Sequence, residues 1–541
     1  MFDQILDPVH SVLGSTLVAL VPVVVLLLLL AVFRLSAWQA VIIGAIVTVL
    51  LGTLVWHAPI TKALTAYGLG SASGFWSIDW IVFWGVIIYN TMVATGAFDE
   101  FKRWLVEHAT ADIRVQTLLM AWAFGALMEG LVGFGYPWAV VAPLLISFGI
   151  ADLAAIRVAA LANNAPVSFG ALGAPIIGLA TVTGLPLLDL SAAIGKIVAV
   201  LALAPPWILL YLVSGRRGVR EGWPLALVGS FAYIAGQFPT SQYLGPYLPD
   251  VIGSLVCFAA LLGLLKIWKP RTTMGFGGRD LTDEEIEEHR RSTVGEGGAS
   301  TGRSPLRGLL PFGILIVVVV AWTGPWSSLP KYIPFAPKIS ALSSLAHEAV
   351  STTWKFAPFV AGTAILVCWV LISLYLRPNR AQLRKVFVDS FRQIWGALLV
   401  GPLIFGLAEV YNYSGMANSM ANGFAKLGTW FLVLSPVLGW IAVALSGSNT
   451  SSNAVFGQFQ YTVARLLHAP VLLFPSLNSL GAEVGKPVAP QTASVGVSTT
   501  RFVRNEGQVI RYNMGWTLVI LAYLICIGIL FYFVFPGAVS L

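Results

Sequence analysis

The stretch SGSNTSSN, residues 446–453, places small and mostly polar residues between two long apolar runs, WFLVLSPVLGWIAVAL (430–445) and AVFGQFQYTVARLL (454–467). Such runs are typical of membrane-embedded helices, so the stretch predicts a chain reversal at membrane depth. Backbone that leaves a helix there must have its amides and carbonyls satisfied by protein or by a watery cavity. We therefore interpret 446–453 as the tip of a re-entrant hairpin that lines a site. An ordinary surface turn between two spans is the alternative.

The composition is that of a membrane protein. Of the 541 residues, 57% are hydrophobic and only 10% are charged, against roughly 25% charged in soluble domains. Apolar windows at 16–33, 38–56, 251–265 and 514–535 suit helices that cross a lipid bilayer. We expect an all-α polytopic membrane protein. Its first window is interpreted as a retained helix, because acidic rather than basic residues precede it.

Other classes of protein find little support in the sequence. Cys257, Cys368 and Cys526 are scattered singly in apolar segments, so neither a disulfide nor a metal site is predicted. The formal charge of +8 requires no nucleic-acid partner, since Lys and Arg accumulate in cytoplasmic loops of membrane proteins. The six histidines form no H-E-x-x-H motif or similar constellation, so we expect neither an enzyme nor a cofactor.

Basic loops orient the predicted spans. Counting apolar windows gives about twelve spans plus two hairpin-like regions. With twelve spans, the basic segments 214–223, 377–385 and 501–511 fall on one side, which the positive-inside rule makes cytoplasmic. Both termini are then extracytoplasmic, in a multi-pass protein of the cell membrane. The polar segment 269–307 is predicted to be a flexible cytoplasmic linker with a short charged helix.

An internal repeat relates the two halves of the chain. Gly96 and Gly415 each end a span, and a small-residue break follows each at a similar distance, GLVGFGYP (130–137) and SGSNTSSN. Further on, NNAPVSFGALGAP (163–175) and NSLGAEVGKPVAP (478–490) align without gaps. An odd number of predicted crossings separates equivalent elements, so the two copies have opposite orientation. Inverted repeats with interrupted helices are typical of secondary transporters.

The expected organisation follows from these repeats. Re-entrant hairpins are predicted near 133–135 and 446–453, and broken helices near 163–175 and 478–490. The expected segments are N-terminal helices at 1–77, repeat 1 at 78–213, connecting helices at 214–268, the linker at 269–307, scaffold helices at 308–386 and repeat 2 at 387–541.

The two predicted tips offer donors to an anion. The second tip contributes hydroxyl and amide groups from Ser448, Asn449, Thr450, Ser451, Ser452 and Asn453. A helix that starts there adds free N–H groups, which attract carboxylates. At the first tip, Gly133 and Gly135 allow backbone to approach a ligand closely, with small-residue helix packing as the alternative.

Two ionisable residues lie beside the breaks. Glu129 precedes GLVGFG, and Lys486 lies inside the second interrupted helix. Charges at such depth are costly and usually face a partner, a cavity or a relay. We expect Glu129 to carry a coupling proton, because desolvation favours the neutral carboxyl group, and Lys486 to attract an anionic substrate. A structural ion pair between the two, or snorkelling to the interfaces, is the alternative.

Several of these motifs resemble a known family. EGLVGFGYPWAVVAPLL, NNAPVSFGALGAPI, NYSGM, SGSNTSSNAVFG and GKPVAPQTASVG are similar, in this order and across most of the chain, to motifs of the lactate permease family. The resemblance implies proton-coupled import of lactate and glycolate across the cytoplasmic membrane. It also implies the fold of the ion-transporter superfamily, whose members pair two re-entrant hairpins with two broken helices and often move by an elevator mechanism.

The resemblance also points to individual residues of this chain. Beside the proton-coupling Glu129, the expected site comprises Gly133, Phe134, Gly135, Pro137, Asn163, Asn164, Ala165, Pro166, Ser448, Asn449, Thr450, Ser451, Ser452, Asn453, Gly485, Lys486, Pro490 and Gln491.

This chain departs from the family pattern at both tips. Asn449 stands where the family commonly has Asp, which removes a possible proton or cation carrier and favours Glu129 for coupling. Tyr136 and Trp138 replace smaller residues and indicate a reshaped pocket. We expect symport of a small monocarboxylate with a proton. The alternatives are another organic-anion carrier of the same architecture, either cation-coupled or an exchanger, and a channel.

Overall fold

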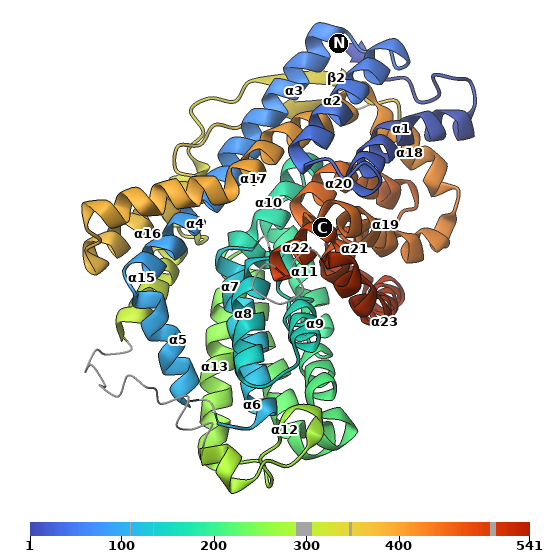
Figure 1. Ribbon diagram of the computed structural model, residues 1–541. Helices are drawn as coiled ribbons and strands as arrows, with labels where there is room; N and C mark the ends of the chain where they lie inside the picture. The colour runs from blue at the N-terminus through green and yellow to red at the C-terminus, as the bar shows by residue number, and fades with distance from the viewer. Residues whose placement is uncertain (109, 134, 288–305, 346–348, 498–504) are drawn as a thin grey trace.

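The computed structural model describes residues 1–541 except 109, 134, 288–305, 346–348 and 498–504, and it is mostly helical (Figure 1). Within the described part, eight helices are long and apolar enough to cross a bilayer. The count becomes nine if the bent pair α9 (Asp152–Ala162) and α10 (Gly170–Thr183) forms one span. The chain is therefore a mostly α-helical polytopic membrane protein, as predicted, while the number of twelve spans stays a prediction.

Among the first helices of the chain, α3 (Ile60–Gly74) packs closely against a long helix of the second half at two glycines. These first helices are α1 (Val12–Ala31), α2 (Ala37–Leu54), α3, the π-helical turn η1 (Phe75–Asp79), α4 (Trp80–Ala94) and α5 (Ala97–His108). A Cβ at Gly74 would lie 2.8 Å from the carbonyl oxygen of Gly401 on α17 (Arg380–Ser414). A Cβ at Gly70 would overlap the carbonyl oxygen of Phe405. Such close approach between small residues is typical of helices packed in a membrane.

A hairpin and a bent helix follow in the first half. The first hairpin arm consists of α6 (Ile113–Thr117), the π-helical segment η2 (Leu118–Phe124) and α7 (Gly125–Leu131), and the second arm is α8 (Tyr136–Ser147). Gly133 and Gly135 have φ values of 64° and 77° in the turn between the arms, a conformation that glycine adopts without strain. The 3-10 turn η3 (Val167–Phe169) joins α9 to α10, and the two helices meet with a 66° bend.

The middle of the chain corrects one expected loop. It contains α11 (Leu187–Leu201), α12 (Pro205–Tyr243) and α13 (Pro249–Ile267). The predicted loop 214–223 is wrong as a loop, because α12 continues through it with a kink at Gly215, where φ is 64° and ψ is −166°. An ion pair one helical turn apart, between Arg217 and Glu221 at 2.9 Å, supports the helix there.

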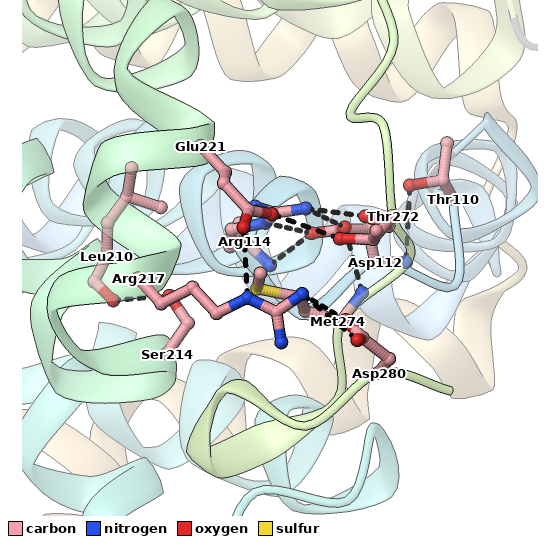
Figure 2. Close-up of polar contacts among 10 residues, drawn as sticks. All are labelled: Thr110, Asp112, Arg114, Leu210, Ser214, Arg217, Glu221, Thr272, Met274 and Asp280. Carbon is pink, nitrogen blue, oxygen red and sulfur yellow. Dashed lines mark hydrogen bonds and ion pairs between the residues drawn. The ribbon is translucent and has the colours of Figure 1, made fainter. Parts of the chain in front are cut away.

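Two arginines hold the start of the predicted linker (Figure 2). Arg114 is buried and donates to both carboxylate oxygens of Asp112, at 2.9 and 2.6 Å, and to the carbonyl oxygen of Thr272 at 2.7 Å. Arg217 of α12 donates to both carboxylate oxygens of Asp280 at 3.0 Å. The beginning of the segment that we predicted to be flexible is therefore fastened to α6 and α12.

The rest of the predicted linker is only partly described. Residues 283–287 are helical, in agreement with the expected short charged helix, whereas residues 288–305 lie outside the described part of the chain.

The second half repeats the order of elements in the first. Its helices are α15 (Leu306–Thr323), α16 (Ala361–Leu376), α17, α18 (Met416–Ala425), α19 (Phe431–Ser446), α20 (Asn449–Leu466), α21 (Leu473–Gly485), the 3-10 turn η7 (Lys486–Val488), α22 (Pro490–Val497) and α23 (Glu506–Phe533). Gly96 after α4 and Gly415 after α17 both have positive φ, 76° and 94°. In each half a short helix, a hairpin and an interrupted helix then follow.

A small sheet that the sequence did not predict joins the N-terminus to the connection between α15 and α16. Strand β1 (Phe2–Asp3) pairs in parallel with β2 (Lys338–Leu342), which pairs antiparallel with β3 (Ala349–Thr353). The Thr352 hydroxyl of β3 donates to Glu409 of α17 at 2.7 Å, which ties the sheet to the helices.

Candidate functional site

Each interrupted helix packs against the hairpin of the other half. α10 runs beside α20, and α22 runs beside α8 (Figure 1). Glycines bring the elements close: a Cβ at Gly135 would lie 2.8 Å from Thr492 Cγ2, and one at Gly178 would lie 3.2 Å from Thr450 Cγ2. The two predicted tips and the two predicted breaks therefore meet in one central region.

The second tip is shorter than predicted. Gly447, with φ of 74°, ends α19, and the Ser448 hydroxyl accepts a hydrogen bond from the Ser451 N–H at 3.2 Å. Ser448 thus caps α20 and starts it early. Residues 449–453, which we expected in the tip, form the first turns of α20 instead.

The first tip and the first break lie against each other. A Cβ at Gly133 would lie 3.1 Å from the Ala171 Cβ, and Ala171 has a positive φ of 46°. Asn164 is fully buried, and neither polar atom of its side chain has a hydrogen-bond partner among the described residues. Buried polar atoms are usually paired, so Asn164 is a candidate ligand group. Phe134 lies outside the described residues, as does the side chain of Tyr136.

We expected Trp138 to reshape the ligand pocket, but its side chain borders neither of the two cavities described below. Its side chain is fully buried, and a Cβ at Gly496 of α22 would lie 2.8 Å from Trp138 Cε3. The indole therefore packs the first hairpin against the second interrupted helix.

A buried ion pair joins the two halves. Lys486 Nζ lies 2.6 Å from Glu129 Oε1, with both residues at most 4% exposed. The Asn163 amide donates to Glu129 Oε2 at 3.1 Å, so both carboxylate oxygens are occupied. The pairing that we considered as an alternative is thus present. Because such a pair is strongly coupled in a dry interior, neither charge can be lost alone at low cost.

A second polar network connects the second tip to both breaks. Asn453 Nδ2 donates to Pro175 O and to Ser479 Oγ, both at 3.0 Å. The Ser479 and Ser168 hydroxyls lie 3.2 Å apart, and the Ser168 N–H donates to Glu483 Oε2 at 2.9 Å. This network joins Asn453, which we predicted, to Pro175, Ser479, Ser168 and Glu483.

Two cavities lie on either side of the region where α10, α17 and α20 meet. The first, of about 470 Å³, is bordered by the second tip, Gln491, α1, α2, η1 and α17, and we call it the tip chamber. The second, of about 640 Å³, is bordered by β3, the ends of α10 and α20, and α17, and we call it the sheet chamber.

A thin layer of side chains separates the two chambers. Ser77 borders the sheet chamber, whereas its neighbours Ile78 and Asp79 border the tip chamber. A Cβ at Gly178 would lie 2.9 Å from Phe405 Cζ and within 3.6 Å of both Thr450 and Ile78. We call these four residues, Ile78, Gly178, Phe405 and Thr450, the septum.

The predicted site residues thus fall into two groups. Ser448, Thr450, Ser451 and Gln491 line the tip chamber, whereas the other predicted site residues that the structure describes, among them Asn449, Ser452, Asn453, Glu129, Lys486, Asn163 and Asn164, line neither of the two chambers. Asp79 was missed. A lone acid in the apolar run FWSIDWIVFW was the available signal for Asp79, because ionisable residues inside membrane spans are usually functional.

Apolar helices around paired hairpins and interrupted helices, with polar and charged groups buried at the breaks, define a multi-pass membrane protein of the transporter type. A family model described as L-lactate permease matches residues 15–535. The chain belongs to the L-lactate permease family.

Curated relatives match over almost their whole length. The glycolate permease GlcA of Escherichia coli K12 is 34% identical and covers 99% of each chain. The L-lactate permease of Bacillus subtilis 168 is 32% identical over 96% of this chain and 95% of that protein.

Solved structures show a more distant likeness. MtrF of Neisseria gonorrhoeae, described as one of a class of antimetabolite efflux pumps, has a TM-score of 0.48 at 14% identity and covers 94% of this chain and 97% of that one. The YdaH transporter of Alcanivorax borkumensis has a TM-score of 0.44 at 15% identity, covering 88% of this chain and 90% of that one.

Proposed function

We propose that this protein is a secondary active transporter that moves a small monocarboxylate of the 2-hydroxy acid type, such as L-lactate, D-lactate or glycolate, together with a proton across the cell membrane. The names of the relatives support the substrate class. The observation that carries the proton coupling is the buried Glu129–Lys486 ion pair.

The pair links proton binding to substrate binding. With Glu129 ionised, Lys486 is neutralised within the protein and has no charge to offer a ligand. A proton on Glu129 releases the ammonium group, and an unpaired buried ammonium costs several kcal/mol. The carboxylate of the substrate offsets that cost by taking the place of Glu129. Substrate and proton therefore bind together, and the site keeps a net charge of zero, which suits passage through the midplane.

The architecture supports alternating access by two repeats. The halves share the order of left-handed glycine, short helix, hairpin and interrupted helix, and each hairpin packs on the interrupted helix of the other half. We propose that 78–213 and 387–541 are inverted repeats, with both termini extracytoplasmic. Movement of one repeat against its surroundings then exposes the central site to each side in turn.

The test of coupling is uptake of radiolabelled L-lactate and glycolate into proteoliposomes without Na⁺, with and without an inward proton gradient. The wild-type protein should accumulate substrate only with the gradient. Glu129→Gln cannot take up the proton or compete for Lys486, so it should lose gradient-driven accumulation while it retains exchange of internal for external substrate. Accumulation at the wild-type level in Glu129→Gln would refute the coupling role, and a requirement for Na⁺ would favour a cation-coupled carrier.

A further inference from the structure

The tip chamber has one charged wall. Its lining residues include a single ionisable side chain, Asp79, among apolar residues, glycines, hydroxyl groups and the amides of Gln393 and Gln491. Asp79 is 5% exposed and lies at the end of the π-helical turn η1. A π-helical turn carries an extra residue and changes the direction of the side chains that follow, and such turns are frequent at functional sites.

The Asp79 carboxylate packs directly against the backbone of Gly401, which has no side chain. A Cβ at Gly401 of α17 would overlap Asp79 Oδ1, so only glycine leaves room for the carboxylate there. Oδ2 is buried and has no hydrogen-bond partner among the described residues. Glu129 has a lysine and an asparagine as partners, but the lining of this chamber contains no cation for Asp79. Burial without a counter-charge disfavours the ionised carboxylate, and a second negative charge in the chamber would add to that cost.

Another part of the chamber lining suits a carboxylate ligand. It consists of the start of α20, where Ser448, Thr450 and Ser451 all border the chamber. The Ser451 hydroxyl donates to the Ser448 hydroxyl at 3.0 Å, which leaves the Ser448 proton available for another acceptor. The unpaired N–H groups and the dipole of a helix N-terminus favour an anion at this end.

Charged groups around η1 are distant from Asp79 or face elsewhere. Of the helices packed against η1, α4, α10 and α16 carry no Asp, Glu, Lys, Arg or His, and α3 carries Lys62 near its other end. On α17, Arg392 and Glu409 stand nine and eight residues from Gly401, about 12–14 Å along the helix axis. Glu409 borders the sheet chamber, together with Lys355 and Arg465.

We propose that the tip chamber is a binding site for a small hydroxycarboxylate, with the ligand carboxylate at the start of α20 and Asp79 protonated in another part of the lining. The inference rests on the proposed function and adds a second substrate site, separate from the Glu129–Lys486 pair and with its own proton-binding residue. Two carboxylates share a chamber whose lining has no cation, so at most one of them is ionised. Binding of the anion therefore takes up a proton at Asp79.

The experiment measures binding of L-lactate to the purified protein by calorimetry across pH, with proton uptake followed by an indicator dye in weak buffer. For the wild-type protein, each proton taken up on binding should make the affinity fall by a further factor of about ten per pH unit at alkaline pH. Asp79→Asn should take up one proton fewer on binding, and its affinity should depend less steeply on pH. Asp79→Glu should restore the dependence, and Asp189→Asn, which alters an exposed acid at the start of α11, should behave as wild type.

A second readout locates the ligand. In a background with Cys526, the exposed native cysteine, replaced by Ala, Gln491→Cys should react with a thiol reagent more slowly when L-lactate is present. Proton uptake and pH dependence in Asp79→Asn equal to those of the wild-type protein, or an absence of protection at Gln491→Cys, would overturn the inference. If the wild-type protein binds and transports no monocarboxylate, the proposed function fails instead, so the two failures are distinguishable.

Discussion

Lys486 receives its counter-charge from a residue 357 positions earlier in the chain. The sequence offered this pairing only as an alternative, because the ion pair depends on how the first hairpin meets the second interrupted helix. The sequence does show that a lysine and a glutamate in apolar surroundings require partners, because an unpaired charge there is energetically costly. Site prediction at this scale therefore identifies candidates, and the fold decides which of them meet.

Deleting one charge of the pair should destabilise the protein more than deleting both. Lys486→Met leaves Glu129 buried without its cation, and removal of one partner of a buried pair typically costs about 3–5 kcal/mol. The midpoint of thermal unfolding in detergent should therefore fall. The double variant Glu129→Gln/Lys486→Met should recover most of the loss. Equal instability of the single and double variants would show that packing, rather than charge, is responsible.

The hairpins and interrupted helices are the elements that the sequence predicted best. Gly, Pro and clustered small polar residues interrupt apolar runs at each of them, so the breaks are locally encoded. Their bounds were less accurate: Ser448 caps α20 early, and α21 extends to Gly485, which confines the second break to a few residues. The sheet was missed because β1 has only two residues and pairs with a segment more than 300 positions away. Long-range pairing of this kind has no local pattern.

Contact between the second hairpin and its interrupted helix depends on glycine. A Cβ at Gly439 of α19 would overlap the carbonyl oxygen of Asn478 on α21. Gly439→Ala should therefore force the helices apart and lower stability by about 1–3 kcal/mol, seen as a lower unfolding midpoint. Gly515→Ala is the matched control, because nothing lies within 4 Å of a Cβ at that position on α23. That control should be neutral or stabilising by up to about 1 kcal/mol, and similar losses in both variants would contradict the contact.

At the scale of the whole molecule, the two chambers outline a proposed route for the substrate, and the septum between them closes it. The septum joins side chains of η1, α10, α17 and α20, so it includes elements of both proposed repeats. The septum could not be predicted from the sequence, because its four residues share no motif and lie far apart in the chain. A relative shift of α10 and α20 against α17 would separate Gly178 and Thr450 from Phe405.

Phe405 supplies the largest side chain of the septum and is fully buried. Phe405→Ala should open a connection between the chambers. We expect faster downhill efflux of L-lactate from preloaded proteoliposomes and weaker accumulation against a gradient. Phe391→Ala, on the exposed face of the same helix, serves as the control and should match the wild-type protein. Unchanged efflux in Phe405→Ala would show that the barrier lies elsewhere.

The hydrogen bond from Ser168 to Glu483 joins positions 315 residues apart, the same interval that separates the aligned motifs at 163 and 478. Under the proposed duplication, each residue therefore touches its own counterpart, which happens only on the axis that relates the copies. In an ancestor built from two identical chains, this point would have held two serines or two glutamates. A glutamate facing a serine amide requires two different sequences, so the two copies diverged at this point after the duplication.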